Sequence, residues 1–459
     1  MHTSRSSRTL LTLPLELQRE IISHVALVPN RKDYQDPPVS LDIYRVRDDR
    51  DVASLLNWSS TCKWFRTLLA PRCFETISLW NSAQSALSVH AIAQGEWAGS
   101  VKALRYVAQL KEGQECLSIA ELHPPEVEAI LTRISQFPNL EQLTVSFLIH
   151  YQEIWSALRR EQTTNFINVN PGFTTIEENR HPWRALLSAG VNSIIQNPSY
   201  GRLKTFEIQN LGVFPASAYG SQKFLKLFSK LKTFRLSFSE LGQTGYLDPN
   251  FQFFKQLGPW FFNNLSVVEN LSVDAGRRHL LSEQVYYGSN NTGLREARMP
   301  KLRNVKFQNL FLCQEVVAFL TKHLGTLESI TLENCYGNHS LKPQHVLYPF
   351  SYHWWQLFDA LKAESPTRLV AFELNFTRNE KGLIQWGKKP PPYENEWYSQ
   401  LKKSEVQPGK IFLYGVAFPG DGLTYPYPEA IQESLREGLD ESGYLSLMAM
   451  VECNVKKRK

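Results

Sequence analysis

One short alternation of apolar and polar residues recurs along most of the chain. In each copy a leading apolar residue is followed, after two further residues, by an apolar–polar–apolar triplet. The clearest copies begin at Leu140, Leu203, Leu231, Val268, Leu302, Leu327 and Leu369, and looser copies begin at Phe74 and Val101. The last four residues of a copy alternate with the period of a β-strand, with one face buried and the other in water. Each copy therefore predicts a short strand.

Segments with helical periodicity lie between these strands. The apolar residues of 127–137, 183–195 and 316–324 each fall on one face of a helix. A strand followed by a helix, repeated, is the unit of a leucine-rich-repeat solenoid, in which the strands form a parallel sheet and the helices cover its outside. The sequence therefore predicts an α/β protein with an irregular solenoid over residues 71–380. For any single copy, an ordinary buried strand is the alternative.

The spacing of the copies is irregular, and asparagine follows several of them. The intervals from 140 to 203 and from 327 to 369 are long, which predicts inserted loops or a further repeat. The asparagines are Asn210, Asn309, Asn334 and Asn375. Asparagine can satisfy backbone groups where a chain turns away from a strand, so we expect turns at these positions.

The polar positions of the strand copies are expected to face the concave side of the sheet. As candidate substrate-binding residues they include Lys204, Glu207, Arg235, Lys306, Thr331 and Glu373. Together they form a polar stripe with charges of both signs. Two interpretations are open: a solvated sheet face, or a recognition surface for a protein of complementary charge.

Residues 10–70 follow a different pattern. The segment 13–25 predicts a short amphipathic helix, with Pro14 in its first turn, where its missing N–H costs nothing. Leu17 and Ile21 fall on one stripe of this helix and Ile22 lies beside it. Residues 29–51 are polar and predict a loop, and a second helical run follows over 52–69.

This N-terminal segment resembles an F-box. The family begins with Leu-Pro-x-Glu-[Leu/Ile] and closes with Cys-[Lys/Arg]-x-[Phe/Trp], and the matching stretches here are 13–17 and 62–65. The family's F-box binds the Skp-type adaptor of a cullin–RING ubiquitin ligase. The resemblance implies adaptor contacts at Leu13, Pro14, Leu17, Ile21, Ile22 and Phe65. The loop 29–51 is longer than the family's usual link, and the alternative is a helix pair that only caps the first repeat.

Composition and motifs exclude several other classes. The net charge of +6 over 459 residues is a weak bias, and the one dense basic cluster is 456–459, so we expect no nucleic-acid partner. No apolar stretch approaches the ~18 residues of a membrane helix, and the six cysteines form no C-x-x-C pair, so we expect a cytoplasmic or nuclear protein. Phosphate-binding loops, nucleophile elbows and zinc-binding helices are missing from the sequence, so we expect no catalytic residue, metal or cofactor.

Together these patterns predict three parts: an F-box-like helical domain over 10–70, the solenoid over 71–380, and a C-terminal cap region with a basic tail over 381–459. We expect a non-enzymatic substrate-recognition subunit of an SCF-type ubiquitin ligase, with the adaptor bound at the F-box and an unknown target protein at the repeats. The alternative is a leucine-rich-repeat scaffold with no ligase role.

Overall fold

A computed structural model describes residues 63–111, 113–114, 117–149, 171–197, 201–239, 249–276, 292–338, 352–375, 412–417, 424–426 and 428–458. The predicted helix 13–25 and the loop 29–51 lie outside these residues. Of the six candidate adaptor contacts, only Phe65 lies within them, on α3 (Lys63–Cys73).

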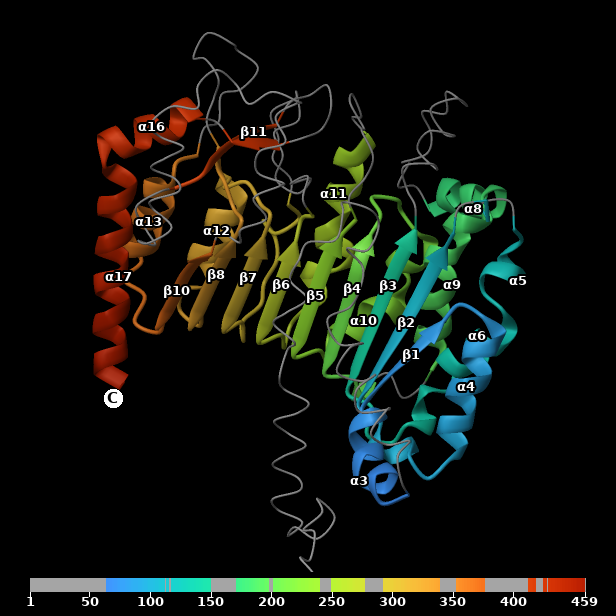
Figure 1. Ribbon diagram of the computed structural model, residues 1–459. Coiled ribbons are helices and arrows are strands. Elements are labelled where there is room, and N and C mark those ends of the chain that lie inside the picture. The colour runs from blue at the N-terminus through green and yellow to red at the C-terminus, as the bar shows by residue number, and fades with distance from the viewer. Residues whose placement is uncertain are drawn as a thin grey trace, which may run out of the picture.

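A parallel sheet of nine strands forms the centre of the described structure (Figure 1). Its strands are β1 (Thr76–Trp80), β2 (Ala103–Leu110), β3 (Gln142–Ile149), β4 (Thr205–Leu211), β5 (Thr233–Phe238), β6 (Asn270–Asp274), β7 (Asn304–Gln308), β8 (Ser329–Glu333) and β10 (Ala371–Asn375). They pair in chain order, and every pairing is parallel. Each strand coincides with one predicted copy of the alternating pattern, so the predicted strands are confirmed.

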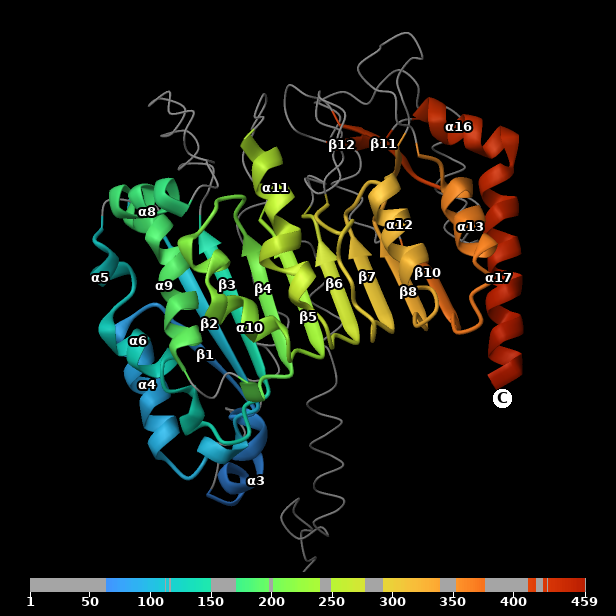
Figure 2. The same ribbon diagram turned by 180° about the vertical axis from the view of Figure 1, so that it is seen from behind.

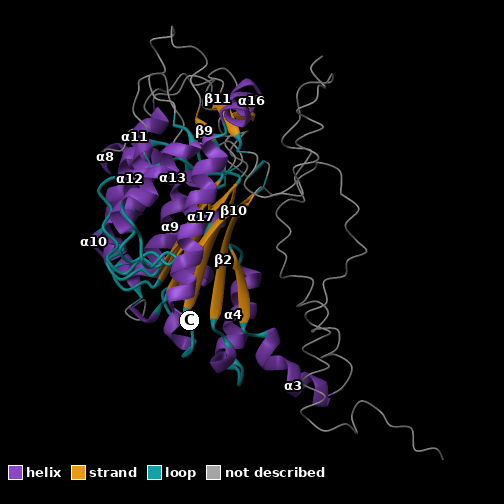
Figure 3. Cartoon of the chain, turned by 90° about the vertical axis from the view of Figure 1, so that its left-hand side faces the viewer, coloured by secondary structure: helices purple, strands orange, loops and turns teal. Residues whose placement is uncertain are grey.

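The crossover helices lie on one face of this sheet. They are α4 (Ala83–Gln94), α6 (Pro125–Leu131), α9 (Pro182–Gln196), α10 (Gln222–Phe228), α11 (Pro249–Trp260), α12 (Gln314–His323) and α13 (Trp354–Ala363). Seen from behind and from the side, they form a single layer against the strands (Figures 2 and 3). Parallel connections share one hand, so a chain that always adds its next strand at the same edge places every helix on the same side. The opposite face is not covered by any described helix.

The buried face of the sheet is built from residues that align across the strands. One register row consists of Ile77, Leu104, Leu143, Phe206, Phe234, Leu271, Val305, Ile330 and Phe372. All of them are buried. Burial of such side chains stabilises the fold by roughly 1.5–3 kcal/mol each. The stacking of one strand copy on the next therefore provides the core that a single copy lacks.

Asn309 and Asn334 mark the turns that directly follow β7 and β8, as expected, whereas Asn210 lies inside β4 beside a shift in the strand register and Asn375 is the last residue of β10. Asn210, Asn309 and Asn334 have φ angles of 57°, 54° and 51°. Asparagine tolerates this left-handed conformation better than other non-glycine residues. The clearest side-chain support of a turn comes from Asn81, after β1: its Nδ2 donates to the carbonyl oxygens of Gln109 (2.9 Å) and Leu122 (2.8 Å).

Two long segments between strands contain elements that the repeat pattern did not predict. Between β3 and β4, α8 (Pro171–Arg180) precedes α9; the shorter segment between β2 and β3 also contains α5 (Ile119–Leu122), which precedes α6. Between β8 and β10, a short strand, β9 (Gly337–Asn338), pairs with β11 (Tyr414–Ala417), which also pairs with β12 (Thr424–Pro426). α8 thus packs against α9 in the helical layer, and β9, β11 and β12 form a second, three-stranded sheet.

The C-terminal helices lie at the last strand of the sheet. Within the predicted cap region, α16 spans Pro428–Glu437, and the longer α17 (Leu439–Arg458) follows it. α17 packs along α13 and against β10 (Figure 1). Its Asn454 donates through Nδ2 to the carbonyl oxygens of Pro366 (2.6 Å) and Leu369 (3.0 Å). These bonds anchor α17 to the segment that leads into β10.

Candidate functional site

The face of the sheet opposite the helices carries polar side chains that align in rows. The middle row consists of Ser78, Arg105, Thr144, Glu207, Arg235, Ser272, Lys306, Thr331 and Glu373, one from each strand in order. Five of the six predicted substrate-binding residues lie in this single row; Lys204 does not. Neighbouring strands are about 4.8 Å apart, so these side chains stand next to one another although they are far apart in sequence.

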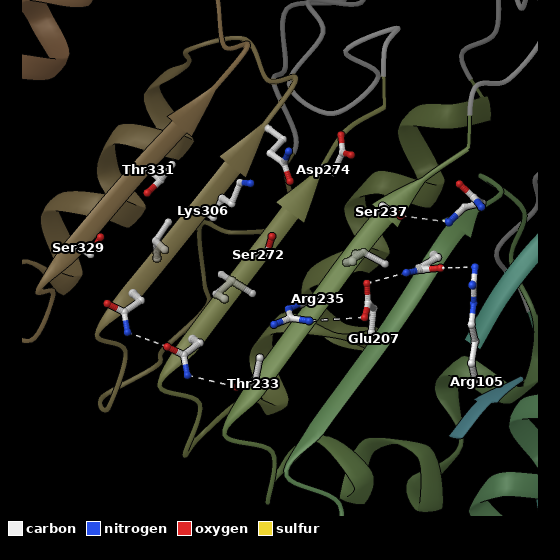
Figure 4. Close-up of a pocket in the computed structure, with 18 residues that line it drawn as sticks. Arg105, Glu207, Thr233, Arg235, Ser237, Ser272, Asp274, Lys306, Ser329 and Thr331 are labelled. Atoms are coloured by element: carbon white, nitrogen blue, oxygen red, sulfur yellow. Dashed lines mark hydrogen bonds and ion pairs between the residues drawn. The ribbon is translucent and has the colours of Figure 1, made fainter. Parts of the chain in front are cut away.

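A hollow of about 770 Å³ opens over this face, lined by residues of β2 and of β4 to β8 (Figure 4). Glu207, Arg235, Lys306 and Thr331 line it. Glu373 lies at the next strand, where its Oε2 accepts a long hydrogen bond of 3.5 Å from Thr331 Oγ1. The structure therefore brings four of the six candidates around one volume and places a fifth at its border.

At one end of the hollow, Glu207 contacts one cation directly and is linked to a second through Gln209. Arg235 Nη1 lies 3.7 Å from Glu207 Oε2. Gln209 Nε2 donates to Glu207 Oε1 at 2.8 Å, and Arg105 Nη2 donates to Gln209 Oε1 at 3.3 Å (Figure 4). These contacts link β2, β4 and β5, and they leave the Arg235 side chain half-exposed toward the hollow.

At the other end, Lys306 and Asp274 lie on neighbouring strands. Lys306 Nζ pairs with Glu333 Oε2 at 2.6 Å while its side chain stays 42% exposed. The Asp274 carboxylate accepts hydrogen bonds from Asn309 Nδ2 (2.7 Å) and from the backbone N–H of Gly276 (2.9 Å). Burial nevertheless raises the pKa of Asp274 above its ordinary value, because desolvation disfavours the charged form more than these bonds favour it.

Below the charged row, neutral amides and hydroxyls form a second row. Asn304 Nδ2 donates to Asn270 Oδ1 at 2.7 Å, and Asn270 Nδ2 donates to Thr233 Oγ1 at 3.2 Å (Figure 4). Ser329 continues this row on β8. Such groups both donate and accept hydrogen bonds, so this side of the hollow suits the main chain of an extended peptide.

Lys204 belongs to a different structure, a row of charges at the edge where the strands begin. Its backbone N–H donates to the carbonyl oxygen of Glu141 at 2.8 Å, one residue before β4 starts, and its Nζ pairs with the Glu141 carboxylate. Equivalent pairs are Lys102–Glu75, Lys232–Glu269 and Arg303–Glu328. These exposed pairs neutralise one another along the edge, and Lys204 is not among the residues that line the hollow.

Several lining residues were not among the sequence candidates. Arg105 lies in the looser copy that begins at Val101, and Asp274 follows directly on the apolar residue that ends its copy. Ser272 carries no charge, and nothing in the sequence around it marked it as a candidate binding residue. An alignment of all the copies on their apolar triplets would have placed Arg105 and Ser272 in the same row as Glu207.

One buried arrangement resembles a nucleophile with a base. His123 Nε2 lies 3.2 Å from Ser193 Oγ, and His123 Nδ1 lies 2.9 Å from Tyr106 Oη. Ser193 Oγ, however, donates its proton to the carbonyl oxygen of Ala189 at 2.9 Å. All three side chains are buried behind the sheet, and burial lowers the pKa of His123 to about 4. The group is a packed hydrogen-bond network that joins β2 to α9.

Within the described part of the chain, no group of three or more His, Cys, Asp or Glu side chains is arranged to hold a metal ion. Among the same residues, no helix is both long enough and apolar enough to cross a membrane.

Fold and site thus define an α/β protein with a nine-stranded parallel sheet, one face of which is polar and carries charges of both signs. This architecture is consistent with a leucine-rich-repeat-like parallel face. No protein-family model matches the chain. No curated protein matches it either.

Proposed function

We propose that this chain is the substrate-recognition subunit of an SCF-type cullin–RING ubiquitin ligase. In this proposal residues 10–70 form an F-box that binds the Skp-type adaptor. The nine-stranded sheet is a leucine-rich-repeat solenoid, and its polar face holds the target protein. The chain itself carries out no covalent chemistry; it raises the local concentration of target lysines near the charged ubiquitin carrier.

The proposal rests on two features that occur together in one chain. A Leu-Pro-Leu-Glu-Leu stretch at 13–17 precedes a parallel sheet whose strands add in chain order and whose polar face contains the hollow. A solenoid alone provides a surface for binding. The N-terminal motif is what links that surface to a ligase.

The candidate adaptor contacts divide into two groups. Phe65 is only 8% exposed on α3, which favours a role in packing rather than in contact with a partner. Leu13, Pro14, Leu17, Ile21 and Ile22 remain the proposed contacts. Short helices that offer a small apolar patch to a partner's groove are a common mode of recognition.

Co-purification of the full chain with a purified Skp-type adaptor tests the ligase link. We expect the wild-type chain to bind and Ile21→Asp to lose the adaptor with an unchanged melting temperature. The matched control is Ile176→Asp, because Ile176 is an apolar residue that is 59% exposed on α8. If the wild-type chain binds no adaptor under conditions in which another F-box protein does, the ligase proposal is wrong.

The second candidate function is a protein-interaction scaffold without a ligase role. The polar face favours it as much as it favours the first, since the face is the same in both. In that case residues 10–70 only cap the solenoid. Ile21→Asp would then lower the melting temperature of the whole chain, and there would be no adaptor binding to lose.

A further inference from the structure

We propose that the hollow binds an extended acidic peptide segment, with one Asp or Glu carboxylate seated over Ser272 between Arg235 and Lys306. This inference rests on the target-binding half of the proposed function and names the chemistry of the target. It does not depend on the ligase link.

The register places the two cations on either side of a short side chain. Arg235 on β5 pairs with Ser272 on β6, and Ser272 pairs with Lys306 on β7. Two strand spacings separate the cations, about 10 Å between their backbones. Ser272 fills little of the space between them, and its hydroxyl points into the hollow (Figure 4). A carboxylate above it can accept from the hydroxyl and from both cations.

Both cations remain available for such a ligand. The side chains of Arg235 and Lys306 are 50% and 42% exposed. Their carboxylate partners lie on the outer sides, Glu207 on β4 and Glu333 on β8, away from Ser272. The nearest acidic group on β6 is Asp274, two residues along the strand. Its Oδ1 already accepts from Asn309 Nδ2 and from the backbone N–H of Gly276, and these donors partly offset its repulsion of a bound carboxylate.

The charge balance favours a singly charged carboxylate over a phosphate. Arg105, Arg235 and Lys306 line the hollow with Glu207 and Asp274, and Glu333 pairs with Lys306. Three basic and three acidic groups therefore lie together, with no excess positive charge to hold a dianion. A carboxylate needs only the local field between Arg235 and Lys306, whereas a phosphate would also meet the neighbouring Glu207 and Glu333.

The neutral row beside the charges fits the backbone of the same segment. Thr233, Asn270, Asn304 and Ser329 offer amide and hydroxyl groups from four successive strands. The distance from β4 to β8 is four strand spacings, about 19 Å. An extended segment of about six residues spans that distance. The hollow is therefore matched to a short linear stretch of a partner.

Synthetic ten-residue peptide libraries with randomised flanks and a fixed central residue test the proposal on the immobilised full chain. The central residue is Glu, Gln, Lys or phosphoserine. We expect the central-Glu library to be retained about tenfold more than the central-Gln library, a ratio that corresponds to about 1.4 kcal/mol. Retention of the phosphoserine library at or above the level of central Glu would overturn the carboxylate assignment.

Two matched pairs of variants locate the site. Lys306→Gln is expected to remove the preference for Glu, whereas Lys204→Gln, which also loses a lysine paired with a glutamate on this sheet, is expected to keep it. Ser272→Asp supplies a carboxylate between the two cations and is expected to block central-Glu peptides. Ser78→Asp, in the same row on β1 and outside the hollow, is expected not to block them.

Equal losses in both members of either pair, or no preference of the wild-type chain for Glu over Gln, would overturn the inference. The adaptor assay separates this result from the ligase proposal. A chain that binds the adaptor and shows no acidic preference keeps its proposed function and loses this site. A chain that prefers acidic peptides and binds no adaptor fits the scaffold.

Discussion

The ring of Tyr106 occupies the space that a side chain at position 190 would need. A Cβ added to Gly190 would lie 2.4 Å from Cε1 of Tyr106, which is far inside van der Waals contact. Tyr106 points inward from β2, and Gly190 lies within α9. The contact therefore sets how closely this helix approaches the sheet, near the strands that carry Arg105 and Glu207 on the opposite face.

Gly190→Ala is expected to destabilise the chain by about 1–3 kcal/mol, because either the tyrosine ring or the helix must shift in a close-packed core. In an exposed helix the same change would stabilise by up to about 1 kcal/mol. Chemical denaturation measures the difference. Gly325→Ala is the control, since an added Cβ at Gly325 meets nothing within 4 Å. A Gly190→Ala protein as stable as wild type would contradict the close packing.

The stability of the folded chain is expected to fall with pH over the range in which an exposed histidine binds a proton and the buried His123 does not. Burial lowers the pKa of His123 from 6.5 to about 4. Between these values the unfolded chain binds the proton and the folded chain does not. The contribution is therefore complete above pH 6.5 and is lost as the pH falls toward 4, up to about 3 kcal/mol.

His123→Asn is the variant that checks this pH dependence. It is expected to be less stable than wild type at pH 7.5, because it breaks the bonds to Tyr106 and Ser193, and to lose less stability between pH 7 and 5. Thermal unfolding at several pH values gives both quantities. His90→Asn, on the exposed side of α4, should keep the wild-type slope, and equal slopes for all three proteins would count against the assignment.

Asp440 is expected to hold the C-terminal helices against the end of the sheet. Its Oδ1 accepts from the backbone N–H of Trp355 at 2.7 Å, and its Oδ2 accepts from Tyr414 Oη at 2.7 Å and from the Ser434 hydroxyl. Asp440→Asn turns one acceptor into a donor at a buried site, at a cost of about 3 kcal/mol. Hydrogen exchange should show faster opening of α17 and α13.

Asp359→Asn is the control for this change, because Asp359 is exposed on α13 and pairs only at the surface, with Lys362 at 2.9 Å. It should alter stability by less than about 1 kcal/mol. If the backbone amides of α17 exchange as slowly in both variants as in the wild-type chain, the Asp440 contacts do not anchor the C-terminal helices.

Arg184 is expected to be the most sensitive charged residue of the helical layer. It is fully buried on α9, where its Nη2 donates to the carbonyl oxygen of Pro215 at 3.2 Å. Burial lowers its pKa to about 10, against the opposing effect of Glu177 and Glu178. Arg184→Met removes the buried positive charge near the Glu177 and Glu178 carboxylates and should cost about 3–5 kcal/mol.

The control for Arg184 is Arg180→Met on the exposed side of α8, with an expected change below about 1 kcal/mol. Urea denaturation compares the two. A loss in Arg184→Met no larger than in Arg180→Met would mean that the carboxylates are balanced by other groups.

Much of the sheet could be predicted because the strand signal is local. The alternation of Phe206, Glu207 and Ile208 assigns the first and third residues to the core and the second to the open face, and the structure has them so. Because side chains alternate between the two faces of a strand, burying the apolar residues leaves the residues between them on the open face. The extra elements, such as α8 and β9, were not predicted because their packing depends on distant segments.

The amino-acid sequence by itself thus determined where the strands lie, which of their residues face inward, and that the outward residues are polar and of mixed charge. Only the tertiary structure decided which of those polar residues meet. Arg105 and Gln209, 104 positions apart, form a hydrogen bond, whereas Lys204 and Glu207, three positions apart, belong to different rows. The loops that connect paired strands differ in length, so the distance between two residues in the sequence does not measure their separation on the polar face of the sheet. The hollow around Ser272 exists because register, and not spacing along the chain, sets its neighbours.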